Sequence, residues 1–309
     1  MWNTLFKTMD STTDNLKTVI VTGASNGLGL ESVKKFAKDF PNYRIIMACR
    51  NIPKATSLKE SLEKETNHKN LIVMEIDTAS LASVQNFVKN YKNSSYGKIY
   101  GLICNAGIGG HCKGLSIDGY DIIFATNHLG HFLLVNSLLP CFEENGRILI
   151  ISSDMHDPPE EFKKEKYEWL GGEKLAKPDE SLTNSNIRYS YSKLCNLYFT
   201  YEFKKRMKDK KIIINAFNPG YIPETGLKGD NKVPAHVIKK IAEEHPEVMG
   251  DLDKCSQAMC DIISDQNIKT NGDYFDKSIK TKKSSELSYN EKNAKELWDL
   301  SESYVKNYY

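Results

Sequence analysis

Short apolar segments alternate with amphipathic segments along most of this 309-residue sequence. The first, residues 17–22 (KTVIVT), is rich in β-branched residues and leads through a glycine-containing turn into helical spacing at 27–40. Further apolar segments of this kind follow at 43–48, 71–76, 99–104, 147–152, 211–217 and 272–275. Because strands that are apolar throughout must be covered on both faces, the alternation predicts an α/β fold with a doubly wound parallel sheet of about seven strands.

Helices are predicted between these strands at 53–67, 81–91 and 189–208, and no linker rich in Pro, Gly or Ser divides the chain. We therefore expect residues 16–309 to form one domain and residues 1–15 to be a flexible arm. Two segments, 154–188 and 221–250, lie outside the alternating pattern. Both follow strands at the carboxyl edge of the sheet, where such folds bind ligands. We expect them to wall a substrate pocket; the alternative is that they are plain surface insertions.

Charge and cysteine content argue against several classes of protein. The chain has 42 basic and 40 acidic residues, a net charge of +2, which gives no basis for a nucleic-acid partner. Seven cysteines without a CxxC pair indicate neither a disulfide framework nor a zinc site, and favour a reducing, cytoplasmic compartment. The chain contains no run of about 18 apolar residues, so we expect no membrane span. His128 and His131 lack a carboxylate at ligand spacing, so we expect core histidines and no metal.

A glycine-rich turn, TGASNGLG at residues 22–29, separates the first predicted strand from the first helix. Glycines there permit a tight turn and let the backbone approach a pyrophosphate at the N-terminus of the helix. The spacing is GxxxGxG, which indicates a dinucleotide site in a Rossmann-type domain. Its expected cofactor-binding residues are Gly23, Ser25, Asn26, Gly27, Leu28 and Gly29.

The same turn also matches GxSxG, the nucleophile elbow of the α/β-hydrolases, with Ser25 as the nucleophile. A hydrolase elbow normally follows several earlier strands that supply its oxyanion-hole loop, whereas Ser25 follows the first. The hydrolase hypothesis also leaves Gly29 unexplained, so we rank it last.

Arg50 stands just past the second strand, where enzymes that use NAD often carry an acidic residue for the ribose hydroxyls. A guanidinium can instead pair with the 2′-phosphate of NADP, so Arg50 favours NADP(H). NAD(H) remains the alternative, because the neutral Asn26 adds no second cation. Asp77 follows the third strand, where it is expected either to accept a hydrogen bond from the adenine amino group or to cap the next helix.

Candidate catalytic residues follow the later strands. The turn Asn105-Ala106-Gly107, after the fourth strand, would let the backbone pass beneath the cofactor ribose. The fifth strand ends in Ser152-Ser153, where a hydroxyl could bind the substrate oxygen on which charge develops.

Tyr189 and Lys193 lie one helical turn apart at the start of the predicted helix 189–208, so they share one face. An ammonium near a phenol favours the phenolate, so we expect Lys193 to lower the pKa of Tyr189 and prepare it for proton transfer. Tyr191 is the competing tyrosine, but it points to a different face of the helix.

In this order the motifs resemble the short-chain dehydrogenase/reductase family over nearly the whole chain. The matching motifs are residues 22–29, Asp77, Asn105-Ala106-Gly107, Asn127, Ser152-Ser153, Tyr189 with Lys193, and Asn218-Pro219-Gly220. The resemblance implies that Tyr189 donates and accepts the proton and that Lys193 also holds the nicotinamide ribose. It implies a water-mediated proton relay supported by Asn127, and it prefers Ser153 to Ser152.

The resemblance also implies cofactor contacts after the sixth strand, from Pro219, Gly220, Ile222 and Thr225. Thr225 stands one residue later than the threonine that usually follows Pro-Gly in the family.

Within the family, TGASNGLGLE, IIMACRN, NHLGHFLL and YSYSKLCNL resemble the retinol dehydrogenase and protochlorophyllide reductase branch. The C-terminal AKELWDLSESYV looks like the end of protochlorophyllide reductases. Two features depart from the pigment enzymes: Tyr221 replaces a cysteine linked to pigment binding, and Ser152-Ser153 replaces Gly-Ser. The first departure most weakens protochlorophyllide as the substrate.

Together these features predict an NADP(H)-dependent oxidoreductase that transfers a hydride between nicotinamide and a carbonyl or alcohol. The alternatives are a C=C reductase of the protochlorophyllide reductase type and a non-enzymatic cofactor-sensing protein. Aromatic residues at Tyr167, Trp169 and Tyr221 favour a bulky, apolar small-molecule substrate. By resemblance, helices near 116–143 and 189–208 would pair subunits in a homo-oligomer.

Overall fold

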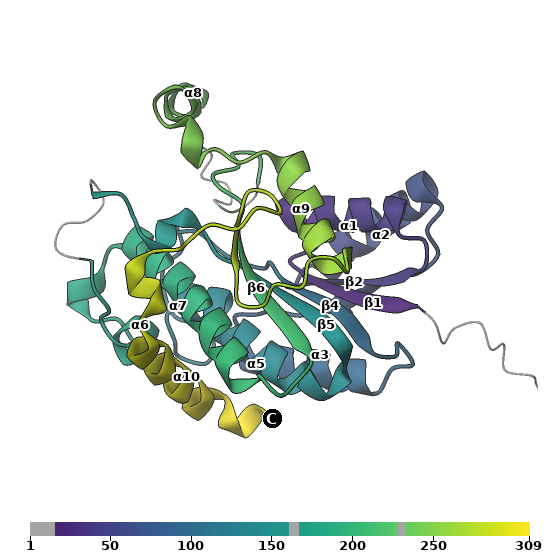
Figure 1. Cartoon of the computed structure of the whole chain (residues 1–309), viewed down its shortest axis with the longest axis horizontal. Helices are drawn as coiled ribbons and strands as arrows, with labels where there is room; N and C mark the ends of the chain where they lie inside the picture. The colour runs from purple at the N-terminus through teal and green to yellow at the C-terminus, as the bar shows by residue number, and fades with distance from the viewer. Residues whose placement is uncertain (1–15, 161–166, 226, 228–232) are drawn as a thin grey trace, which may run out of the picture.

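A computed structural model describes residues 16–160, 167–225, 227 and 233–309, so the predicted arm at residues 1–15 lies outside the described part. Its centre is a parallel seven-stranded sheet in the order β3-β2-β1-β4-β5-β6-β7 (Figure 1). The strands are β1 (Lys17–Thr22), β2 (Tyr43–Cys49), β3 (Leu71–Glu75), β4 (Ile99–Cys104), β5 (Phe142–Ile151), β6 (Ile212–Asn218) and β7 (Tyr274–Asp276). The strand order reverses between β1 and β4, which confirms the doubly wound fold.

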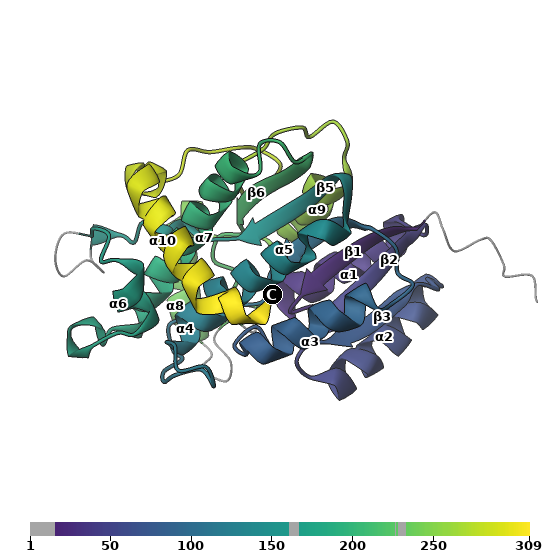
Figure 2. The ribbon, with the colours of Figure 1, turned by 90° about the horizontal axis from the view of Figure 1, so that it is seen from below.

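The strands are apolar throughout because their side chains alternate between two helical layers. On β1, Val19 and Val21 enter one hydrophobic core and Ile20 enters the other. Figures 1 and 2 show the two layers on opposite faces of the sheet. The first layer contains α1 (Gly27–Asp39), α2 (Ile52–Thr66) and α9 (Leu252–Ser264). The second contains α3 (Leu81–Lys92), α5 (Gly130–Leu138), α7 (Ser185–Arg206) and α10 (Glu291–Val305).

The predicted strand bounds agree with the structure to within two residues, except at β5. This strand starts at Phe142, five residues before the predicted start at 147. Its first half contains the polar Glu143, Glu144 and Asn145, and Asn145 has a φ of 63°. The pairing of β4 with β5 also shifts register there. An irregular, solvent-facing strand start carries no apolar pattern, so the sequence could not reveal it.

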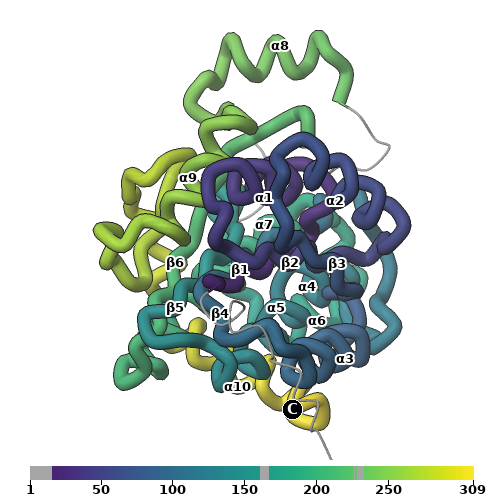
Figure 3. Tube along the Cα trace, turned by 90° about the vertical axis from the view of Figure 1, so that its right-hand side faces the viewer, coloured from purple at the N-terminus to yellow at the C-terminus, as the bar shows by residue number. Residues whose placement is uncertain are grey.

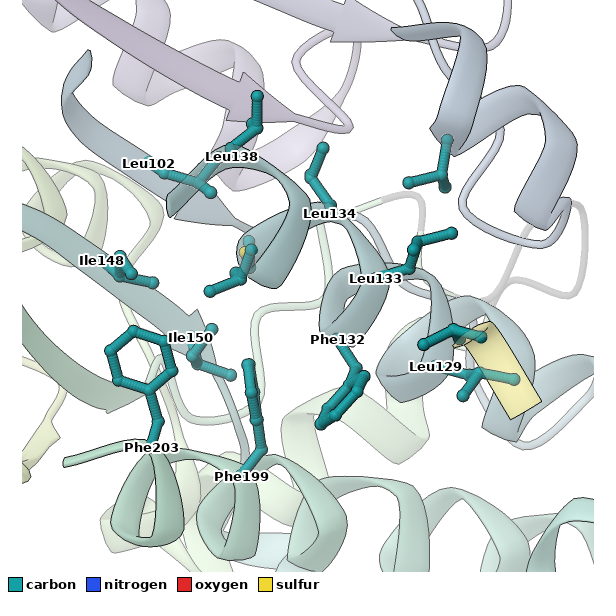
Figure 4. Close-up of a cluster of buried hydrophobic side chains, with 14 of the residues drawn as sticks. Leu102, Leu129, Phe132, Leu133, Leu134, Leu138, Ile148, Ile150, Phe199 and Phe203 are labelled. Atoms are coloured by element: carbon teal, nitrogen blue, oxygen red, sulfur yellow. The ribbon is translucent and has the colours of Figure 1, made fainter. Parts of the chain in front are cut away.

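The segment after β4 forms a broken helix made of α4 (Ile122–Phe124), a π-helical turn (Ala125–Leu129) and α5. One stretch, Ile122–Cys141, is long and apolar enough to cross a membrane, yet 83% of its apolar window is buried inside the protein. Figure 4 shows why: Phe132 on α5 points toward Phe199 on α7, beneath β5. The apolar character of this stretch therefore serves the core.

Helix α10, which the strand and helix patterns did not predict, lies across α5 and α7. Its Trp298 ring lies 4.9 Å from that of Phe132 and 5.7 Å from that of Phe199. This is the layer through which we expected subunits to pair, so α10 occupies part of the surface that such pairing would need.

Helix α8 (Ala235–Glu244) lies in the predicted pocket segment 221–250 and has no buried residue. It extends away from the rest of the protein in Figures 1 and 3.

Candidate active site

The predicted catalytic residues gather where β5 ends and α7 begins. Ser153 follows β5 by two residues, and Tyr189 and Lys193 are the fifth and ninth residues of α7, about one helical turn apart. The Lys193 Nζ atom lies 5.5 Å from the centre of the Tyr189 ring and donates a hydrogen bond to the Ile151 carbonyl at 3.0 Å. This hydrogen bond joins the end of β5 to α7. The three predicted side chains therefore lie together at one edge of the sheet.

The protonation states of these groups are controlled by burial. Burial raises the pKa of Tyr189 above its ordinary range, a hydrogen bond with Ser153 lowers it, and the nearby Asp154 carboxylate raises it further. Burial lowers the pKa of Lys193 to about 8. Burial has the largest effect on the pKa of Tyr189, and the lowering expected from Lys193 stays a prediction. Tyr189 is a neutral phenol at neutral pH and is ready to donate a proton.

Asn127 joins two parts of the site from the π-helical turn. Its side chain accepts a hydrogen bond from the Ile108 amide at 2.9 Å and donates to the Ile108 carbonyl at 3.0 Å and to Ser192 Oγ at 2.9 Å. Ser192 Oγ in turn donates to the Tyr189 carbonyl at 2.7 Å. Asn127 thus ties the loop after β4 to the part of α7 that carries Tyr189, a connection that the sequence did not predict.

The two histidines next to Asn127 are buried, hydrogen-bonded core residues. His131 bonds to Thr22 Oγ1 at 3.0 Å and to the Asn127 carbonyl at 3.3 Å, and His128 bonds to Ser301 Oγ at 2.9 Å. Burial lowers the pKa of His128 to about 3 and that of His131 to about 4. Both rings are neutral at physiological pH and act in packing, as the sequence predicted.

The glycine turn is built for a close approach of the backbone. Gly23 and Gly27 have φ values of 68° and 50°, which favour glycine. A Cβ atom on Gly29 would lie 2.5 Å from the Gly23 carbonyl oxygen and 2.6 Å from Asn105 Nδ2. Asn26 caps α1 by accepting a hydrogen bond from the Gly27 amide at 2.9 Å. The turn therefore leads tightly into the N-terminus of α1, where backbone amides can bind an anion.

The turn after β4 is bound directly to the end of β1. The amides of Asn105 and Ala106 each donate to Thr22 Oγ1 at 2.9 Å, and Asn105 Nδ2 donates to the Thr22 carbonyl at 2.8 Å. A Cβ on Gly107 would lie 3.2 Å from Asn127 Oδ1. The predicted cofactor-binding residues of β1 and β4 thus form one hydrogen-bonded unit.

Arg50 and Asp77 lie at the ends of β2 and β3, where we predicted recognition of the adenosine part of the cofactor. Their charged groups are 4.0 Å apart, and 74% of the Arg50 side chain is exposed. Asp77 Oδ1 accepts from the Ala79 amide at 3.0 Å, while Ser80 caps the following helix. Asp77 therefore shapes the turn before α3, and Arg50 keeps most of its guanidinium surface open to solvent.

The segment after β6 closes over the glycine turn. Gly220 has a φ of 70°, and Asn218 Oδ1 accepts hydrogen bonds from the amides of Gly220 and Asp154, both at 3.0 Å. Thr225 lies so close to Gly27 that a Cβ there would meet its side chain at 3.2 Å. The side chain of Ile222 is buried in the core under α1 and α9. The structure therefore brings this segment against the predicted cofactor turn.

Two aromatic residues predicted near the substrate lie elsewhere. The Tyr167 ring stacks on that of Tyr191 at 4.7 Å, and Trp169 meets Tyr198 edge-on at 5.0 Å. Both partners belong to α7 and are buried in the core. Tyr167 and Trp169 therefore hold the segment before α7 in place and say nothing about the substrate. Residues 161–166 of this predicted pocket segment lie outside the described residues.

Sequence reasoning missed three residues beside the catalytic group. Asp154 Oδ1 accepts a hydrogen bond from Ser153 Oγ at 3.0 Å. His156 Nδ1 donates to the Ser153 carbonyl at 2.7 Å, and its Nε2 accepts from the Ser285 amide at 3.0 Å. Tyr274 on β7 is buried, and its ring meets that of His156 edge-on at 5.4 Å. Asp154 and His156 lie within three positions of Ser153, so their place in the sequence was a local signal, whereas Tyr274 comes from a distant segment.

Comparison with known proteins places the chain in a family. Residues 17–162 match the short chain dehydrogenase family. The chain is 32% identical over 207 residues to WW domain-containing oxidoreductase of Gallus gallus, covering 66% of this chain and 48% of that protein. It is 30% identical over 208 residues to Retinol dehydrogenase 11 of Homo sapiens, covering 67% of this chain and 61% of that protein.

Among solved structures, L-sorbose reductase from Gluconobacter frateurii, complexed with NADPH and L-sorbose, shares the fold with a TM-score of 0.65 at 18% identity. The alignment covers 86% of this chain and 96% of the reductase. With its motif order and sheet topology, the chain belongs to the short-chain dehydrogenase/reductase family. It spans about half to three fifths of the length of the two curated relatives.

The family assignment contradicts the hydrolase hypothesis, and so does the surrounding of Ser25. The Ser25 hydroxyl lies within hydrogen-bonding reach of the Cys49 thiol. In the described part of the chain, Ser25 forms no hydrogen bond with a histidine that could act as its base.

Proposed function

We propose that this protein is an NADP(H)-dependent oxidoreductase that interconverts a carbonyl compound and an alcohol. The observation that carries the proposal is the meeting of Ser153, Tyr189 and Lys193 beside a glycine turn shaped for a dinucleotide. Retinol dehydrogenase 11 and L-sorbose reductase are named for the same class of reaction.

The residues at the end of β1 fit a dinucleotide. Gly23 and Gly29 leave no room for a Cβ, because the turn packs tightly against the segment after β4. The backbone amides at the start of α1 would bind a pyrophosphate. Arg50 would hold the 2′-phosphate of NADP, because its guanidinium has only one long contact with Asp77. When bound, NADPH supplies the hydride that the carbonyl carbon receives.

The chain's own residues supply the proton and bind the oxygen. Tyr189 gives its phenolic proton to the substrate oxygen as negative charge develops there, which completes the alcohol. Ser153 would hold that oxygen by a hydrogen bond, for which its single hydroxyl proton must turn away from Asp154 Oδ1, its acceptor in this structure. Lys193, with its pKa lowered to about 8, can pass a proton back to Tyr189 near neutral pH. In the direction of alcohol oxidation the same phenol oxygen accepts the proton.

The test is a panel of aldehydes, ketones and matching alcohols assayed with NADPH and NADH. Tyr189→Phe should lower kcat by a factor of about 10²–10⁴ while NADPH still binds. Tyr191→Phe is the matched control, because Tyr191 lies on the same helix but donates to the Glu168 carbonyl at 2.8 Å. If Tyr189→Phe keeps near-wild-type turnover, Tyr189 does not transfer the proton.

A further inference from the structure

A carboxylate stands directly beside the hydroxyl that would bind the substrate oxygen. Ser153 Oγ donates to Asp154 Oδ1 at 3.0 Å. The position of Asp154 is set by its backbone, because its amide donates to Asn218 Oδ1 at 3.0 Å. Asp154 also begins the short turn Asp154–His156, which β5 leads into. The carboxylate is therefore held at the reacting end of the site by the fold and not by a flexible loop.

The lysines nearby neutralise a different carboxylate, that of Asp276. Lys277 and Lys282 lie 4.0 and 3.8 Å from Asp276, which also accepts from Asn218 Nδ2 at 2.8 Å. Between residues 16 and 309, leaving aside 161–166, 226 and 228–232, no lysine or arginine forms an ion pair with Asp154. The ring of His156, directly after Met155, is kept neutral because burial lowers its pKa.

The negative charge is felt at the atoms where the reaction would occur. The Asp154 carboxylate raises the pKa of Tyr189, whose phenol would protonate the substrate oxygen. It also raises the pKa of Tyr274, whose buried hydroxyl has no hydrogen-bond partner among the described residues. A substrate that carries a negative charge close to its carbonyl carbon would therefore be repelled by the Asp154 carboxylate at short range.

We propose that Asp154 determines the substrate class by excluding compounds with a carboxylate or phosphate next to the reacting carbon, so that the site takes neutral carbonyl compounds. This inference rests on the proposed oxidoreductase function. Its physical basis is repulsion between like charges in a partly desolvated site, a common way to reject a wrong partner. The turn that begins at Asp154 keeps this carboxylate next to Ser153, so a small anionic keto acid bound there would lie close to it.

The test compares ethyl benzoylformate with benzoylformate, which present the same ketone beside an ester or beside a carboxylate. The preference for the ester, measured as a ratio of kcat/KM values with NADPH, should fall about 10- to 100-fold in Asp154→Asn. Asn keeps the size of the side chain and an oxygen that can accept from Ser153. Dividing the wild-type ratio by the variant ratio removes the difference in intrinsic reactivity between the two compounds.

Asp209→Asn is the matched control, because it removes the same charge from an exposed position beyond the far end of α7. It should keep the wild-type preference. Asp154→Ser serves as a second variant if Asp154→Asn folds poorly, as judged by circular dichroism. Calorimetric titration of both compounds into the protein loaded with NADP⁺, which has no hydride to transfer, measures the same preference without turnover.

The outcomes separate the inference from the proposed function. An unchanged preference in Asp154→Asn and Asp154→Ser, in both turnover and titration, would overturn the role of Asp154 while leaving the oxidoreductase intact. Wild-type protein that binds NADPH and the ester but reduces no carbonyl would overturn the proposed function, and a titration preference that depends on Asp154 would still support the inference.

Discussion

His128 and His131 are buried without charge beside Asn127, a predicted catalytic residue, so acid should destabilise this protein in a calculable way. Burial lowers the pKa of His128 from 6.5 to about 3 and that of His131 from 6.5 to about 4. As the pH falls, the unfolded chain takes up these protons before the folded protein does. Their contribution to stability is therefore complete above about pH 6.5 and is lost as the pH falls toward the folded-state values.

The size of the loss follows from how far pH 5 lies below the unfolded-state pKa of each histidine. That difference is about 1.5 pH units, and each unit lowers the free energy of unfolding by about 1.4 kcal/mol. Each ring should therefore cost about 2 kcal/mol between pH 8 and pH 5, and the two together about 4 kcal/mol. That is a large part of the 5–15 kcal/mol by which native proteins are usually stable.

Urea unfolding at pH 8, 6.5 and 5 would measure this loss. His128→Phe removes one titrating ring and suits a site lined by Phe124, Phe132 and Phe199. Its free energy of unfolding should fall about 2 kcal/mol less than that of the wild type between pH 8 and pH 5. His245→Asn, at an exposed position, is the control and should follow the wild type. Equal losses in the wild type and His128→Phe would refute the argument from burial.

Three further predictions test the site and the helical layer. Gly29→Ala should weaken NADPH binding at least about tenfold in fluorescence titration, since its Cβ would press on the Gly23 carbonyl at 2.5 Å; unchanged binding would contradict the shape assigned to the turn. Arg50→Ala should weaken NADPH binding about tenfold and leave NADH binding within about twofold, and equal effects on both would rule out 2′-phosphate recognition. Trp298→Ala should lower the free energy of unfolding by about 3–5 kcal/mol, because the ring is buried against Phe132 and Phe199; a smaller loss would mean that α10 contributes little to the core.

Much of the fold could be predicted from local pattern. The bounds of β1 and β4 match their predicted ranges because these strands are buried on both faces and read as continuous apolar runs. The order of the glycine turn, the serine after β5 and the Tyr189/Lys193 pair could also be read directly. These residues depend on backbone geometry within a few positions, which the sequence records.

The remaining features depend on contacts between distant segments. Asp154 becomes part of the site because Asn218, 64 positions away, holds its amide. Tyr167 looked like a pocket residue, but its ring stacks on Tyr191 in the core. The pKa of Tyr189 is raised because the folded protein buries its phenol.

The sequence by itself therefore determined the sheet, its family and the residues predicted to be catalytic. Only the tertiary structure decided which charges face that group and which helix covers α7. The physical reason is that hydrophobic period and turn chemistry act locally along the chain, whereas desolvation and charge act through space.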